Sequence, residues 1–208
     1  MAASNNSSFG PPDFSKPWKF SDVVLVVEDQ KFHVHRSTLS MWSPVFETMF
    51  TSEFKERNMN EIPLPGKKAS DIKELLLIIY PTVSHTGWKS VTNENCYFLV
   101  ELADEYQMDA IKQMCEDFLV KEVYHTSGNK FLAHLPLAQT HKLEKLVKTI
   151  ITKATELQLD DFKSHELYDK MERDLYKQIV EGMIRRLEGR FRVSEHRFQG
   201  APIFGTGK

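Results

Sequence analysis

The chain contains 208 residues, of which 41% are hydrophobic, and its formal net charge is −2 at neutral pH. This length is typical of one domain, or of one domain with a helical extension. Lys and Arg are spread along the chain, and Glu188 dilutes the densest basic stretch, Arg185 to Arg192. The composition therefore excludes a strongly basic surface for nucleic acid or acidic membranes.

Residues 1–17 are rich in Ser, Asn, Gly and Pro, which predicts a flexible leader. The leader lacks the regions of a secretory signal, and no apolar run approaches the ~20 residues of a membrane span. The only cysteines, Cys96 and Cys115, fall on apolar faces of predicted helices. Because this favours buried thiols in a reducing compartment over a disulfide, we expect a cytoplasmic or nuclear protein.

The first predicted elements are two strands and a helix. Val23–Val27 is apolar on both faces, which predicts a strand buried inside a sheet. A polar turn and Phe32–His35 complete a hairpin. Ser43 and Pro44 are favourable as the N-cap and the first residue of a helix. The apolar face of this helix comprises Val45, Phe46, Met49 and Phe50.

A short edge strand and three helices are predicted next. Glu61–Leu64 is extended and contains Pro63, which suits an edge strand. Ser70 or Asp71 is predicted to cap the first of the helices. The three helical stripes comprise Ile72, Leu75, Leu76 and Ile79, then Cys96, Leu99, Val100 and Ala103, then Met108, Ile111, Cys115 and Phe118. Residues 18–122 are therefore predicted to form an α+β domain, a small mixed sheet capped by helices.

Residues 128–193 are predicted to be entirely helical, after a joint at residues 127–129. Their apolar stripes comprise Leu143, Leu146, Val147, Ile150 and Ala154, then Leu167, Met171 and Leu175. Residues 194–208 contain Gly, Pro and isolated aromatic residues, which predicts a disordered tail.

The order of these motifs resembles a BTB (POZ) domain. From Phe20 to Phe54 the chain has a Ser-Asp-Val strand, a Phe-His-Val-His-Arg strand end and a Ser-Pro-Val-Phe-Glu-Thr-Met-Phe helix. Later matches to the family are Leu75–Tyr80, Leu102–Met108, Cys115 and Phe118-Leu119. The resemblance covers Phe20 to Val120 and implies the BTB/POZ fold. The helices that follow resemble the start of a BACK-type (3-box) extension.

The resemblance implies a protein-interaction adaptor, without catalytic residues or a cofactor. Some family members bind the N-terminal domain of cullin-3 through a hydrophobic-x-Glu motif, and Phe54-Lys55-Glu56 stands at that place. Phe54 and Glu56, with Met49 and Phe50, are therefore expected to bind cullin-3, while another surface holds a substrate protein. Alternatively, Phe54 covers the core and Glu56 is solvated. The chain would then be a self-associating scaffold or a transcription-linked interaction module with no cullin role.

Asp22, His35 and Arg36 match polar positions that many family members hold near a homodimer interface. The alternative roles are local, with Asp22 capping a turn and His35 buried and hydrogen-bonded.

The chain departs from the family before Phe20 and after Tyr80. Many members dimerise through an N-terminal helix, which three prolines prevent here, namely Pro11, Pro12 and Pro17. The resemblance therefore does not imply the usual homodimer. The aromatic residues Phe14, Trp18 and Phe20 either cover the exposed surface or mediate a different contact. Trp88 lies in the predicted loop after Tyr80 and is either a partner anchor or a buried side chain.

Metal and enzyme motifs are incomplete. His33 and His35 share a strand face, but no further ligand lies at zinc-site spacing. His165-Glu166-x-x-Asp169 lacks the second His of a metalloprotease motif, and no following helix supports a phosphate loop at Gly205–Lys208. We therefore expect neither a metal site nor catalysis.

Overall fold

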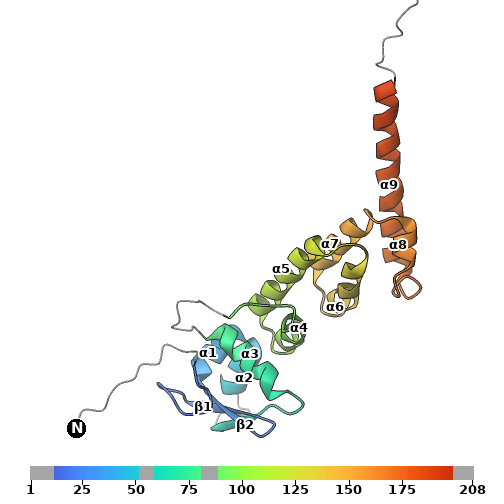
Figure 1. Ribbon diagram of the computed structural model, residues 1–208. Helices are drawn as coiled ribbons and strands as arrows, with labels where there is room; N and C mark the ends of the chain where they lie inside the picture. Colours follow the sequence, from blue (N-terminus) through green and yellow to red (C-terminus); the bar gives the residue numbers. More distant parts are fainter. Residues whose placement is uncertain (1–11, 52–58, 81–88, 199–208) are drawn as a thin grey trace, which may run out of the picture. The chain divides into compact units, whose positions relative to one another are not determined.

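The computed structural model describes residues 12–51, 59–80 and 89–198, and in α9 the side chains as far as Arg192 (Figure 1). The chain divides into two compact units, Met1–Phe118 and Leu119–Lys208. Cys96 and Cys115 are both buried and reduced. Among the described residues, no helix is long and apolar enough to cross a bilayer.

The first unit is built on a mixed three-stranded sheet. Its strands are β1 (Val23–Val27), β2 (Gln30–Val34) and β3 (Glu61–Pro63), in the order β2-β1-β3. The apolar run of β1 is central, antiparallel to β2 and parallel to β3, which confirms the predicted hairpin and edge strand.

Helices complete the first unit. They are α1 (Arg36–Trp42), α2 (Pro44–Thr51), α3 (Ala69–Ile79), α4 (Cys96–Glu105) and the first part of α5 (Asp109–His125). The large side chains that are at most 1% exposed include Leu25, Leu39, Ile72, Leu76, Leu99 and Met108. Leu25 comes from the sheet, Leu39 from α1 and the others from the predicted apolar stripes, so the α+β fold is confirmed.

The start of α2 follows the sequence prediction. The Phe46 N–H donates to Ser43 Oγ over 3.1 Å, so Ser43 caps the helix that begins at Pro44. Ser43 is fully buried, and its hydroxyl donates to the Tyr106 carbonyl over 2.6 Å. One side chain thus both caps α2 and fixes it to the end of α4.

The predicted cap of α3 was wrong. The helix begins at Ala69, and Lys68 in the N-cap position makes no side-chain cap. Instead, the Ala69 N–H donates to Glu28 Oε2 over 2.9 Å. Glu28 belongs to the β1–β2 turn and has a φ of +52°. This carboxylate from a distant turn supplies the acceptor that a local Ser or Asp would otherwise provide.

The second unit is helical in its described part. After the end of α5 it contains a 3-10 helix, η2 (Lys130–His134), and four α-helices, α6 (Leu135–Thr140), α7 (Glu144–Ala154), α8 (Leu159–Lys163) and α9 (Arg173–Phe198). Its largest fully buried side chains are Phe131 and Phe162. Lys153 near the end of α7 donates to the Thr126 carbonyl over 2.6 Å and to the Tyr124 carbonyl over 3.2 Å. It thereby satisfies backbone acceptors at the end of α5.

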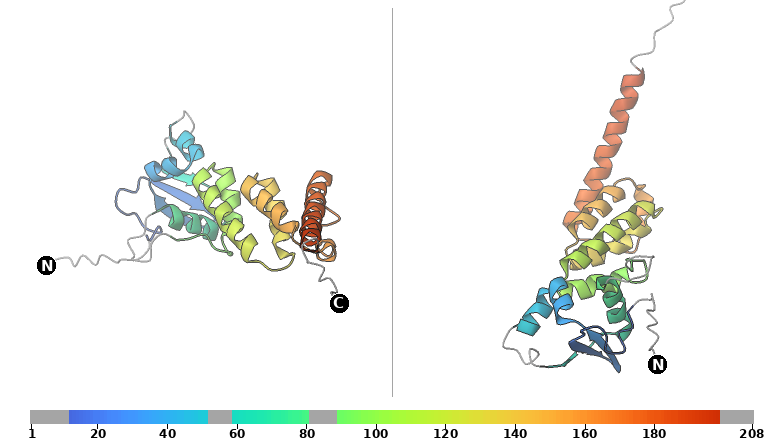
Figure 2. Two further views of the ribbon diagram at one scale, coloured as in Figure 1. Left: turned by 90° about the horizontal axis from the view of Figure 1, so that it is seen from above. Right: turned by 90° about the vertical axis from the view of Figure 1, so that its left-hand side faces the viewer.

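The last helix differs from the prediction at both ends. Leu167 and Met171 precede α9 and lie in a stretch without regular helix, so the buried stripe of α9 begins at Leu175. The helix continues through Ser194, where a tail was predicted, to Phe198. Figure 2 shows its second half extending beyond the other helices of this unit. Ile184 and Leu187, near the middle of the helix, are 49% and 46% exposed.

Candidate partner-binding surface

Aromatic stacking holds α2 in place. The Phe46 ring stacks between Tyr106, at a centroid distance of 4.8 Å, and Phe50, at 6.0 Å. Phe50 is only 8% exposed, whereas Met49 is half-buried. Of these two predicted cullin-binding residues, Phe50 is therefore packed beneath the surface, whereas part of the Met49 side chain is accessible to a partner. Phe54 and Glu56, the centre of that prediction, lie outside the described residues, as does Trp88.

Asp22 and Arg36 form a local network. Asp22 Oδ1 accepts the Arg36 N–H over 2.8 Å, at the first residue of α1. The Arg36 guanidinium lies 4.8 Å from the centre of the Phe50 ring and donates to the Met59 carbonyl. Its Nη1 is buried without a hydrogen-bond partner among the described residues. Arg36 thus joins the start of α1 to the end of α2 and to the chain before β3.

His35 is bonded through its backbone and both ring nitrogens. Its N–H donates to the Tyr80 hydroxyl over 2.8 Å, and Nε2 lies 2.7 Å from the Lys19 carbonyl. Because a carbonyl can only accept, Nε2 carries the proton, and in the neutral ring Nδ1 accepts from the Tyr80 hydroxyl over 3.2 Å. These contacts are local, although His35 is half-buried where the local alternative expected a buried residue. A place for His35 near a dimer interface stays a prediction. Burial also raises the pKa of Tyr80, so its hydroxyl stays protonated at neutral pH.

Part of the segment predicted as a leader is packed on this site. Phe14 is 3% exposed, and its ring lies edge-on to Tyr80 at 5.2 Å. Trp18 lies edge-on to His35 at 4.9 Å, and its Nε1–H donates to the His33 carbonyl over 2.8 Å. Phe14 and Trp18 therefore cover the surface around Tyr80. Phe20 does not, because it is 95% exposed with a φ of +68°.

One exposed apolar residue was missed from the sequence. Met41 on α1 is 82% exposed, whereas Leu39 on the same helix is 1% exposed. Each residue of an α-helix is rotated by about 100° from the one before, so Met41 lies about 200° around the helix from the buried Leu39. This periodicity alone could have predicted that Met41 lies opposite the buried face. Together with Phe20, it offers apolar area to a partner.

The described residues contain no group of three or more His, Cys, Asp or Glu side chains that could hold a metal ion. The ring nitrogens of His35 are occupied by Lys19 and Tyr80, so His33 and His35 do not form a ligand pair.

The sheet, the capped helices and this surface define a BTB/POZ domain. The family model for the BTB/POZ domain matches residues 12–123, more than half of the chain, and the chain belongs to this family.

Its curated relatives carry further domains in their names. BTB and MATH domain-containing protein 38 of Caenorhabditis elegans is 37% identical over 99 residues, which is 48% of this chain and 24% of that protein. BTB and MATH domain-containing protein 36 of the same organism is 27% identical over 169 residues, 81% of this chain and 50% of that protein. Human Kelch-like protein 24 is 28% identical over 158 residues, 74% of this chain and 24% of that protein. The chain thus spans a quarter to a half of these relatives.

Proposed function

We propose that this chain is a protein-interaction adaptor that recruits a substrate protein to a cullin-3 RING ubiquitin ligase. Its BTB domain would bind the N-terminal domain of cullin-3 through Phe54, Glu56 and Met49. The chain itself would perform no chemistry. Membership of the BTB/POZ family carries this proposal, together with the Phe54-Lys55-Glu56 motif at the family's cullin-binding position.

The geometry of α2 supports the proposal. A contact surface is most effective when its framework is rigid before binding. The buried Ser43 cap and the stack of Phe50, Phe46 and Tyr106 fix the helix immediately before the motif. An aromatic anchor such as Phe54 would then fill an apolar pocket of the partner, and Glu56 would accept a hydrogen bond.

Light scattering after size-exclusion chromatography tests this proposal on the full chain mixed with a cullin-3 N-terminal domain. We expect a co-eluting complex that the double variant Phe54→Ala/Glu56→Ala loses. The matched control, Glu188→Ala/Phe191→Ala, removes the same two residue types from α9 in the second unit and should retain the complex. Absence of a complex with the folded wild-type chain would overturn the cullin assignment.

A self-associating scaffold without a cullin role is the second candidate. The exposure of Phe20, at 95%, and of Met41, at 82%, favours it, since a second copy that covered these side chains would remove apolar area from water. In the same chromatography, this function would give a dimer or larger assembly of the chain alone. Phe20→Ser/Met41→Ser should disperse that assembly, whereas Phe54→Ala/Glu56→Ala should leave it intact.

A further inference from the structure

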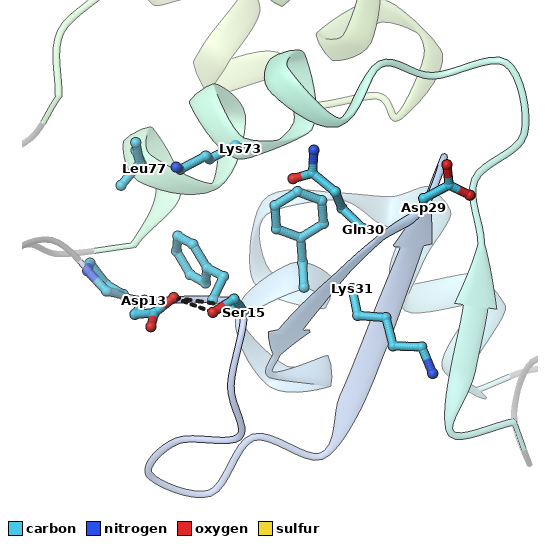
Figure 3. Close-up of a pocket in the computed structure, with 10 residues that line it drawn as sticks. Asp13, Ser15, Asp29, Gln30, Lys31, Lys73 and Leu77 are labelled. Atoms are coloured by element: carbon cyan, nitrogen blue, oxygen red, sulfur yellow. Dashed lines mark hydrogen bonds between the residues drawn. The ribbon is translucent and has the colours of Figure 1, made fainter.

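The free edge of β2 borders a groove of about 670 Å³. This volume lies within the range of roughly 300–1,000 Å³ that is typical of binding pockets. One side is formed by Lys73 and Leu77 on α3, and the other by residues 29–32 of the β1–β2 turn and β2. The segment Pro12–Ser15 lies at one end, as Figure 3 shows.

Sheet geometry turns the backbone of two β2 residues toward this edge. The N–H of Val24 and the carbonyl of Val26 on β1 face the β3 side of the sheet. The Val24 N–H donates to Asn60 O, and the Leu64 N–H donates to Val26 O. Their cross-strand neighbours on β2 are His33 and Lys31. In an antiparallel ladder such pairs are not hydrogen-bonded to each other, so the N–H and C=O groups of both β2 residues point away from β1.

The N-terminal segment already occupies part of this edge, through a turn at Phe14 and Ser15. The His33 N–H donates to the Phe14 carbonyl over 2.7 Å, and the His33 carbonyl accepts the Trp18 Nε1–H. Within the described residues, no corresponding partner meets the N–H or C=O of Lys31. The next position along the edge thus remains available for strand addition.

The side chains of the groove indicate which segment would fit. Phe14 and Phe32 both line the groove, and we call them its apolar floor. Gln30 points toward α3, whereas Lys31 points away from it (Figure 3). The Lys31 ammonium is bound by Glu61 at 2.6 Å. The carboxylate of Asp13 accepts the hydroxyl and the N–H of Ser15.

Lys73 provides positive charge in the groove, and no carboxylate among the described residues lies within salt-bridge distance of it. It does act on Asp13, since hydrogen bonds from Ser15 and, to a smaller extent, the charges of Lys16 and Lys73 lower the pKa of that carboxyl. Asp29 lies in the turn before β2 and disfavours a second anion there. An acidic side chain in a bound segment is therefore favoured in direct contact with Lys73 on α3, and it is disfavoured beside Asp13 and beside the turn.

We propose that this groove binds an extended segment of a partner protein as an added strand on β2. The segment would pair with the Lys31 backbone, place an apolar side chain on the Phe14–Phe32 floor and place an acidic side chain against Lys73. This binding does not depend on the proposed cullin contact, and either can fail while the other persists.

Selection of a phage-displayed library of random heptapeptides on the full chain, followed by calorimetric titration of the enriched peptides, tests this proposal. We expect peptides with an acidic residue among apolar and β-branched residues. Lys73→Glu should weaken their binding by about tenfold or more, as expected for loss of a charge-assisted contact. N-methylation of the peptide amides that face β2 should abolish binding, which tests backbone pairing without altering the protein.

A matched pair of variants tests the edge from the protein side. Lys31→Pro removes the backbone donor, whereas Lys31→Ala removes only the ion pair with Glu61, so only the proline variant should lose the peptides. Circular dichroism must show that both variants are folded. Absence of enriched peptides, or equal binding to wild type, Lys73→Glu and the N-methylated peptides, would overturn the proposal. Binding that appears only after deletion of residues 1–11 would make the chain's own leader the occupant and would also overturn it.

Discussion

At the scale of single residues, Tyr80 holds three segments of the first unit together. Its hydroxyl accepts the His35 N–H just after β2, and its ring contacts Phe14 and Trp18 of the N-terminal segment. It also occupies the C-cap position of α3. The covering role of Phe14 and Trp18 therefore depends on a residue more than sixty positions away in the chain.

The variant Tyr80→Phe tests this role because it keeps the ring and removes only the hydroxyl. It leaves the partly buried His35 N–H without its acceptor, which should lower the free energy of unfolding by about 1–3 kcal/mol. The matched control is Tyr124→Phe, since Tyr124 is 64% exposed and should change stability little. Denaturant titration of both variants provides the comparison, and equal stabilities would show that the His35 N–H does not rely on Tyr80.

At the scale of elements, two glycines of α9 have opposite surroundings. A Cβ atom at Gly182 would lie 2.5 Å from Thr155 Cγ2, at the C-cap of α7, whereas a Cβ at Gly189 would meet nothing within 4 Å. Gly182 thus permits close approach of α7 and α9. Gly189 has no such function in packing.

Alanine substitutions at these positions should therefore differ in sign. Gly182→Ala forces Thr155 to shift and should destabilise the second unit by about 1–3 kcal/mol. Gly189→Ala should stabilise it by about 0.5–1 kcal/mol, because it only removes the helix penalty of glycine. Thermal unfolding monitored by circular dichroism measures both effects. Stabilisation by both substitutions would contradict the close packing of α9 on α7.

At the scale of the whole molecule, the sequence correctly predicted structural elements that depend on residues close together in the chain. The hairpin, the Ser43–Pro44 helix start and the apolar stripes of α3, α4, α5 and α7 are local or periodic, and they are confirmed. The stripe predicted from Leu167 was wrong at its first two residues, which precede α9. The cap of α3 was missed because Glu28 lies 41 positions from Ala69.

For the candidate site, the sequence predicted the family better than it predicted which individual side chains are buried. Motif order identified the BTB/POZ family. It also predicted that α2 contributes to a partner-binding surface, and this stays a prediction. It could not show that Phe50 is covered, because Arg36 of α1 reaches the Phe50 ring only through the packing of α1 on α2. Likewise, the covering of Tyr80 by Phe14 and Trp18 depends on tertiary contacts, so composition alone suggested a flexible leader.

The buried acids of the first unit predict how stability depends on pH. Burial raises the pKa of Cys115 to about 12 from an ordinary value of 9.0, and it also raises the pKa values of Tyr80 and Tyr106. Above about pH 9 the unfolded chain releases the Cys115 proton while the folded chain retains it, so the free energy of unfolding falls as pH rises. The contribution of Cys115 is fully present below pH 9 and is lost progressively up to about pH 12.

Denaturant titrations at about pH 8 and about pH 10.5 should show this loss, of which Cys115 accounts for ~2 kcal/mol at 1.36 kcal/mol per pKa unit. In Cys115→Ala the decrease should be smaller by that amount, although the variant starts from a lower stability because it leaves a small cavity. The buried tyrosines provide the remaining decrease in both proteins. If the two proteins lost the same stability between these pH values, the Cys115 thiol would be reaching solvent, and the tight packing of α4 and α5 around it would be refuted.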